Sequence, residues 1–99
     1  MQAGELEIRP EEFLALVGGR PLHLTARELS LLAALASRAE RIVSREELYT
    51  EVWGEPYRKS DRSVDVYVAR LRQKLERELP GRSYIHTHFG FGYRFSAHP

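Results

Sequence analysis

The sequence of 99 residues contains no cysteine, which excludes disulfide bonds and thiolate metal sites and fits a reducing compartment. No apolar run approaches the roughly 20 residues of a membrane-spanning helix. No signal peptide opens the chain. We therefore expect a cytoplasmic protein with no membrane partner. The length predicts one domain over residues 1–99, large enough to fold around its own core.

The motifs of common enzymes are also missing. The chain has no nucleophile elbow, no H-E-x-x-H pair and no carboxylate–histidine arrangement in a recognisable frame. The run FGFG at residues 89–92 lacks the lysine and the following Ser or Thr of a phosphate-binding P-loop. We expect neither enzymatic activity nor a cofactor, and the glycines fit better as residues of a tight hairpin turn.

The chain has four histidines, and two of them lie close together. His86 and His88 would share one face of a strand, as two metal ligands might. Zinc would need at least one more ligand, and neither His23 nor His98 has a local partner pattern. We therefore expect no metal site and interpret the pair as ordinary strand residues.

Charge is distributed unevenly along the chain, although the net charge is only +1. Residues 1–57 hold six basic and ten acidic residues, whereas residues 58–82 hold eight basic and four acidic residues. Such a segment can present a local basic face to a polyanion such as nucleic acid. It can equally be the solvated face of a helix with mixed charges, and charge alone leaves both readings open.

The periodicity predicts an α+β domain that begins with a short antiparallel sheet. Strands are expected at residues 6–9, 13–17 and 22–25, all within about residues 1–25. Gly18 and Gly19 would form a two-residue hairpin turn, because glycine tolerates positive φ.

Three helices are then expected over residues 26–79. Thr25 with Glu28, and Ser44 with Glu47, have the spacing of capping boxes, and each pair predicts a helix start. The second helix should stop at Gly54. The third should run over about residues 62–79, behind an N-cap at Asp61, and stop at Pro80. A β-hairpin is expected at residues 83–96, with strands at 84–87 and 92–95.

The third helix should bury one face and expose another. Its apolar stripe consists of Val64, Val68, Leu71 and Leu75, at the spacing of a single buried face. The opposite face carries Arg62, Val66, Ala69, Arg70, Gln73 and Arg77. Ser63, Tyr67 and Lys74 flank it on one side, and Asp65 and Arg72 on the other. Its arginines suit phosphate and base-edge contacts, and Val66 suits a thymine methyl group.

Three segments in combination resemble a known family. They are 52-VWG-54, 61-DRSVDVYVARLRQKLE-76 and 84-YIHTHFGFGYRF-95. Together they are similar to the OmpR/PhoB-type winged-helix effector domain of two-component response regulators, and the resemblance covers nearly the whole chain. It implies sequence-specific binding of double-stranded DNA by the output domain of a transcription regulator. The helix at about 62–79 would enter the major groove, and the wing at about 84–95 would reach the minor groove.

Helix geometry and the resemblance together give a set of candidate DNA-binding residues. They are Trp53, Arg62, Ser63, Val66, Tyr67, Arg70, Arg72, Gln73, Lys74, Thr87 and Tyr93. Arg70 matches the base-reading arginine of the family, with Val66 beside it. The positions that match those holding the phosphate backbone are Trp53, Arg62, Ser63, Tyr67 and Arg72, and the wing positions Thr87 and Tyr93 match ones that touch the backbone or groove. The chain departs from the family pattern at Ala69, which is often basic or polar there. It also departs at Phe89, where an arginine is frequent in the wing tip.

The resemblance also implies partners. A receiver domain and a sensor kinase would lie outside this chain, and the loop at residues 54–60 would contact RNA polymerase. Two domains would sit on direct-repeat half-sites, whereas the isolated domain should be a monomer, because the sequence offers no heptad run for a dimer seam. The alternative is a winged helix that binds protein instead of DNA, with Tyr57, Tyr67, Phe89 and Phe91 as an aromatic patch. The cationic helix face argues against it, since interface cores are depleted of lysine.

Overall fold

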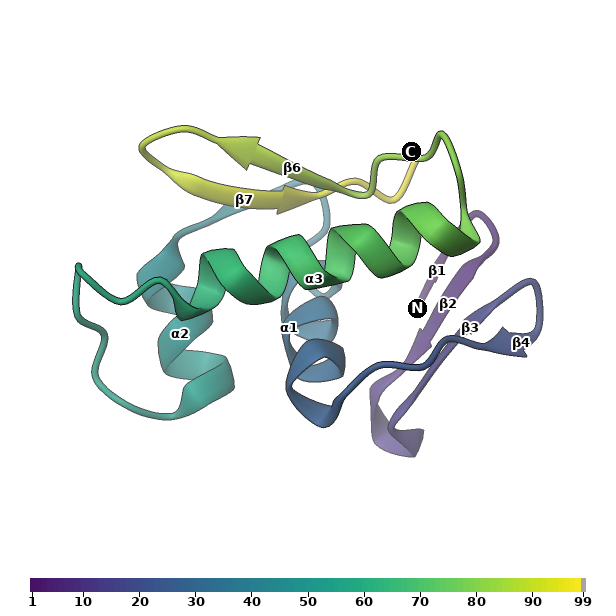
Figure 1. The fold of residues 1–99 in the computed structure, drawn as a ribbon, viewed down its shortest axis with the longest axis horizontal. Helices are drawn as coiled ribbons and strands as arrows, with labels where there is room; N and C mark the ends of the chain where they lie inside the picture. Colours follow the sequence, from purple (N-terminus) through teal and green to yellow (C-terminus); the bar gives the residue numbers. More distant parts are fainter. Residues whose placement is uncertain (99) are drawn as a thin grey trace.

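The computed structural model describes residues 1–98 and shows an α+β winged helix, as predicted (Figure 1). In chain order the elements are β1 (Gln2–Ala3), β2 (Leu6–Arg9), η1 (Pro10–Glu12), β3 (Leu14–Val17), β4 (Arg20–Pro21), α1 (Ala26–Ala36), β5 (Ile42–Val43), α2 (Arg45–Trp53), α3 (Ser63–Glu78), β6 (Ile85–His88) and β7 (Gly92–Phe95). Across the described residues, none of these helices is long and apolar enough to cross a membrane.

The N-terminal sheet is antiparallel in the order β1-β2-β3-β4. Gly18 and Gly19 form the predicted hairpin turn, with φ values of 56° and 81°. The strand predicted at residues 22–25 is wrong, since the last strand is β4 and the chain leaves the sheet just after it. The apolar alternation there comes from Leu22 and Leu24, which pack against the core from the connection to α1.

Both predicted capping boxes are present. The Thr25 hydroxyl accepts from the Glu28 backbone N–H at 3.1 Å, and the Glu28 carboxylate accepts from the Thr25 N–H at 2.8 Å. Ser44 and Glu47 make the same reciprocal pair at the start of α2. Gly54 ends α2 in the left-handed conformation, with a φ of 71°. The first two helices therefore begin as local sequence chemistry predicts, and α2 ends as predicted.

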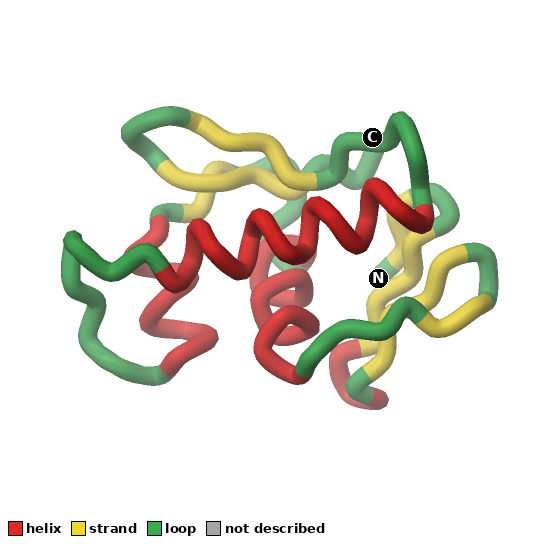
Figure 2. Tube along the Cα trace, viewed as in Figure 1, coloured by secondary structure: helices red, strands yellow, loops and turns green. Residues whose placement is uncertain are grey.

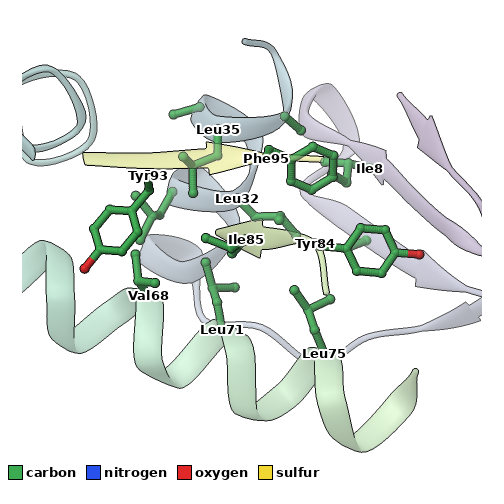
Figure 3. Close-up of a cluster of buried hydrophobic side chains, with 14 of the residues drawn as sticks. Ile8, Leu32, Leu35, Val68, Leu71, Leu75, Tyr84, Ile85, Tyr93 and Phe95 are labelled. Atoms are coloured by element: carbon green, nitrogen blue, oxygen red, sulfur yellow. The ribbon is translucent and has the colours of Figure 1, made fainter. Parts of the chain in front are cut away.

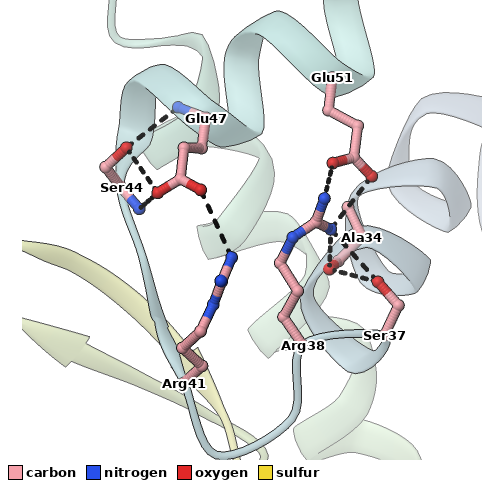
Figure 4. A network of polar contacts seen from close by, with 7 residues as sticks. All are labelled: Ala34, Ser37, Arg38, Arg41, Ser44, Glu47 and Glu51. Carbon is pink, nitrogen blue, oxygen red and sulfur yellow. Dashed lines mark hydrogen bonds and ion pairs between the residues drawn. The ribbon is translucent and has the colours of Figure 1, made fainter.

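Arg38 fixes the corner between α1 and α2 (Figure 4). Its Nη1 donates to the Ala34 carbonyl at 3.0 Å, which satisfies a backbone oxygen at the end of α1. Its guanidinium also pairs with both carboxylate oxygens of Glu51 on α2. The two helices are thus held together outside the core as well as within it.

The third helix spans Ser63–Glu78, one residue shorter at each end than predicted. The Asp61 carboxylate still accepts a hydrogen bond from the Ser63 backbone N–H at 2.8 Å. The N-cap position itself is occupied by Arg62 and not by Asp61 as predicted. The predicted stripe of Val64, Val68, Leu71 and Leu75 is buried. Its side chains pack toward α1 and the C-terminal sheet (Figure 3).

The wing hairpin belongs to a three-stranded sheet in the order β5-β7-β6. Its first strand is shifted by one residue from the prediction, because Tyr84 lies before β6 and instead donates its hydroxyl to the Ala3 carbonyl at 2.8 Å. The short strand β5 was not predicted, and it pairs with β7 at Val43↔Tyr93. The tube view shows this second sheet lying along α3 (Figure 2).

The closest approach in this sheet is at Gly92, whose φ is 144°. A Cβ atom there would lie 2.0 Å from the Val43 carbonyl oxygen. Gly92→Ala should therefore separate β5 from β7 and cost about 3 kcal/mol or more of unfolding free energy. Gly90→Ala is the matched control, because Gly90 has a φ of 83° but open space around a Cβ atom. Urea unfolding of both variants would measure the difference, and equal midpoints would contradict the close approach.

Candidate nucleic-acid interface

The outward face of α3 carries four of the predicted site residues at the surface, namely Arg62, Val66, Arg70 and Gln73. Its exposed residues are Arg62, Val66, Ala69, Arg70, Gln73 and Arg77, as the helix geometry predicted. Val66 is 44% exposed, so an apolar side chain stands in water beside Arg70. Three exposed arginines with an amide and a methyl-bearing side chain can contact phosphates and base edges.

Arg70 lies over one ring of an aromatic cluster. Its guanidinium lies 4.9 Å from the ring centroid of Tyr67, which meets the Trp53 ring edge-on at 5.4 Å. Trp53 in turn stacks on Tyr49 at 5.1 Å and carries the Arg27 guanidinium at 4.9 Å. Arg70 is thus held in place from α2 as well as from its own helix. Sequence reasoning missed Tyr49 and Arg27, although Tyr49 and Trp53 have the i,i+4 spacing of neighbours on a helix.

Arg72 joins α3 to the wing. Its Nη2 donates to the Ile85 carbonyl at 2.8 Å and to the Thr87 hydroxyl at 2.7 Å. Its guanidinium also lies 5.6 Å from the ring centroid of Tyr93. Arg72 and Thr87 were both predicted to face DNA, and the structure brings them together in a contact between the helix and the wing.

Asp65 makes a second junction between α3 and the wing. Its carboxylate accepts from the hydroxyl of buried Tyr93 and from Arg45 Nε at 2.7 Å, and it lies 3.5 Å from Arg62 Nη1. Burial acts to raise the pKa of Asp65, but the hydrogen bonds from Tyr93 and Arg45 outweigh it and leave this pKa below its ordinary value. Tyr93, predicted as a DNA contact, has its hydroxyl engaged inside the protein.

Lys74 ties α3 to α1. Its Nζ donates to the Glu28 carboxylate at 2.6 Å and to the His23 carbonyl at 3.0 Å. Burial acts to raise the pKa of Glu28. The hydrogen bonds from Lys74 and from the Thr25 backbone outweigh burial and leave this pKa below its ordinary value. Lys74 therefore belongs to a partly buried ion pair.

The wing tip is a hydrogen-bonded turn. The Phe91 backbone N–H donates to the His88 carbonyl at 2.9 Å, and Gly90 has a φ of 83° at the third position of the turn. This turn presents Phe89 and Phe91, which are 87% and 72% exposed. The tip therefore offers rings to the surroundings instead of a cation.

The wing histidines are part of the hairpin. Arg94 Nε donates to His88 Nε2 at 3.1 Å, and Arg94 also lies 3.3 Å from the Glu40 carboxylate. His86 is the cross-strand neighbour of Arg94. Within residues 1–98, no three His, Asp or Glu side chains gather where they could hold a metal ion.

The depressed pKa of Asp65 makes a testable contribution to stability. A carboxylate whose pKa is lowered by folding stabilises the fold above its unfolded pKa of about 3.9, and this stabilisation is lost as the pH falls through the lower, folded pKa. At pH 7, Asp65→Asn should cost about 2 kcal/mol, because charge-assisted bonds from Arg45 and Tyr93 are lost.

Thermal unfolding of the variant and the wild type between pH 7 and pH 2 should show this penalty shrinking in acid. Glu78→Gln is the control, since it neutralises an exposed carboxylate on the same helix. A penalty for Asp65→Asn that stayed constant across this range would contradict the assigned role of the charge.

Known proteins share both the sequence and the fold. The family profile described as "Transcriptional regulatory protein, C terminal" matches residues 19–95. The phosphate regulon transcriptional regulatory protein PhoB of Klebsiella pneumoniae is 39% identical over 92 residues, which cover 93% of this chain and 40% of PhoB. The chain spans about 40% of the length of the curated relatives it matches.

Two solved structures superpose closely. The DNA-binding domain of CpxR from Escherichia coli has a TM-score of 0.89 at 34% identity, covering 98% of this chain and 96% of that one. The DNA-binding domain of RstA from K. pneumoniae, in complex with the RstA box, has the same TM-score and identity over 99% and 97%. With three helices, a C-terminal wing and this family match, the chain belongs to the C-terminal domain family of transcriptional regulatory proteins, of the OmpR/PhoB winged-helix type.

Proposed function

We propose that the chain binds double-stranded DNA sequence-specifically, as the output domain of a two-component transcription regulator. The observation that carries this proposal is the outward face of α3, where Arg62, Arg70 and Arg77 stand in solvent beside Val66 and Gln73. A helix of 16 residues is about 24 Å long and fits the major groove of B-DNA. The RstA domain, which shares this fold, has been solved with its DNA box, and this supports the same use here.

The face divides into residues that read bases and residues that hold the backbone. Arg70 is proposed to read a guanine, with Val66 against a thymine methyl group and Gln73 at a neighbouring base edge. Arg62 and Ser63, at the start of α3, would hold phosphates together with the dipole of the helix N-terminus.

The remaining predicted site residues would mainly position this face. Tyr67 lies beneath Arg70, and Trp53 supports Tyr67 from α2. Three side-chain pairs fix the helix to its neighbours: Arg72 with Thr87, Asp65 with Tyr93, and Lys74 with Glu28. The edges of Tyr67 and Thr87 remain partly exposed and can also reach the phosphate backbone. A helix fixed at several points enters the groove in one orientation.

The wider assignments follow from the family and extend the proposal. A receiver domain controlled by a sensor kinase would place two of these domains on direct-repeat half-sites in the cytoplasm. The loop at residues 54–60 would contact RNA polymerase; it is largely exposed, and Tyr57 anchors it by packing on Tyr49 at 5.6 Å. A protein-binding winged helix is the weaker candidate, because the most accessible part of α3 is cationic.

Salt dependence tests the proposed function. Binding of the chain to duplex DNA should weaken steeply with salt, by roughly 0.9 log units in affinity per log unit of salt for each phosphate neutralised. Fluorescence anisotropy titrations at several salt concentrations would measure this slope. A module that binds only protein would show no DNA affinity, and a flat salt response would contradict an arginine-rich interface.

Two arginines of α3 separate base reading from backbone contact. Arg70→Ala should cost about 1–3 kcal/mol on the preferred site and relax the preference at one or two base pairs. Arg62→Ala should weaken binding to all duplexes nearly equally, because a phosphate contact carries no base information. Selection from a random duplex library with each variant would compare them, and the same uniform loss in both would rule out the role given to Arg70.

A further inference from the structure

The wing tip carries an unusual pair of exposed side chains. Phe89 and Phe91 are 87% and 72% exposed, on either side of Gly90. A single exposed apolar residue is ordinary, but two phenyl rings on one tight turn are costly to leave in water. The Gly18-Gly19 turn at the other end of the molecule carries no side chains at all. Burying the two rings of the wing tip against a binding partner would therefore be favourable.

The backbone that carries the two rings is held in place. The hydrogen bond from the Phe91 N–H to the His88 carbonyl closes the turn. Strand β7 is paired on both sides, by β5 and β6. The turn thus presents both phenyl rings to solvent from a fixed backbone.

The position of the tip points to the surface that α3 presents. Ile85 and Thr87 contact Arg72 in the middle of α3, whereas Tyr93 contacts Asp65 in its first turn. The hairpin therefore runs toward the N-terminal end of α3, and its turn lies at that end of the molecule (Figure 1). Exposed Arg62 is at the same end. The tip continues the proposed DNA-binding face.

The chemistry of the tip differs from that of the helix. Residues 89–92 are Phe, Gly, Phe and Gly, and the cation of the adjoining strand, Arg94, is engaged with His88 and Glu40. Phosphate neutralisation is therefore not what the tip supplies. In DNA, the apolar surfaces beside a helix in the major groove are the sugar walls and base steps of the neighbouring minor groove, and phenylalanine side chains can wedge between such steps.

We propose that Phe89 and Phe91 form an apolar wedge that enters the minor groove, packs on deoxyribose and partly opens a base step, so that the duplex bends. This inference rests on the proposed DNA-binding function and adds a second source of specificity to it. The wedge favours flexible pyrimidine–purine steps under the wing, because these cost least to unstack. It reads deformability, whereas Arg70 reads base edges.

The test uses a duplex that the wild-type chain selects from a random library, labelled with a fluorophore at each end. Removing both rings, in Phe89→Ala/Phe91→Ala, should weaken binding roughly 10-fold or more, since buried phenyl area is lost. The salt slope should stay unchanged, because neither ring carries charge. Energy transfer between the duplex ends should rise on binding the wild type and rise less with the variant.

Two further variants act as controls. Phe13→Ala removes a ring that is 82% exposed on η1's C-terminal side and should leave affinity and bending unchanged. Phe89→Arg should steepen the salt slope by about 0.9, since it replaces the apolar contact by a phosphate or groove contact. Thermal unfolding would confirm that each variant is folded.

The outcomes separate this inference from the proposed function. If the wild type bound no duplex, the proposed function itself would fail. If the wild type bound but the double variant bound and bent DNA equally well, the wedge alone would be overturned. The alternative is that the two rings pack against a second copy of this chain, and light scattering would detect such a dimer. Self-association of the wild type that disappeared in the double variant, with DNA affinity unchanged, would also overturn the wedge.

Discussion

The position of α3 against the wing depends above all on one charged group, the carboxylate of Asp65. It receives the Tyr93 hydroxyl from β7 and Arg45 from the start of α2, so three elements meet at a single side chain. Arg72 adds a second connection half-way along the helix, to Ile85 and Thr87. The distance between the helix and the hairpin tip is set here, and the proposed contact with two grooves at once requires that distance to be fixed.

Local sequence chemistry predicted those parts of the fold that local interactions determine. The capping boxes at Thr25 and Ser44 and the stop at Gly54 need only residues within one turn, and all three were confirmed. Strands β1 and β5 have two residues each and are too short to show an alternating pattern. The false strand at residues 22–25 had the right alternation, but its apolar side chains pack on the core from outside any sheet.

The exposed face of α3 was predictable from helical periodicity alone, because a buried stripe determines which residues lie opposite it. The partners of the flanking residues were not. Arg72 and Lys74 read as surface cations in the sequence, yet their acceptors lie 13 to 51 residues away in the chain. A long flexible side chain at the edge of a buried stripe can point to solvent or toward the protein. Which of the two it does depends on acceptors from other elements, which the local sequence does not reveal.

Glu28 serves two helices at once. Its carboxylate accepts the Thr25 N–H that begins α1 and the ammonium of Lys74 in the C-terminal half of α3. Sliding α3 along the domain would thus remove the Lys74 ammonium and leave the buried Glu28 carboxylate without its cation. The Glu28–Lys74 contact therefore adds a polar connection between α3 and α1 to their packing in the core. Because these contacts fix α3 in the free protein, the proposed interface leaves adaptation at an imperfect site to the nucleic acid.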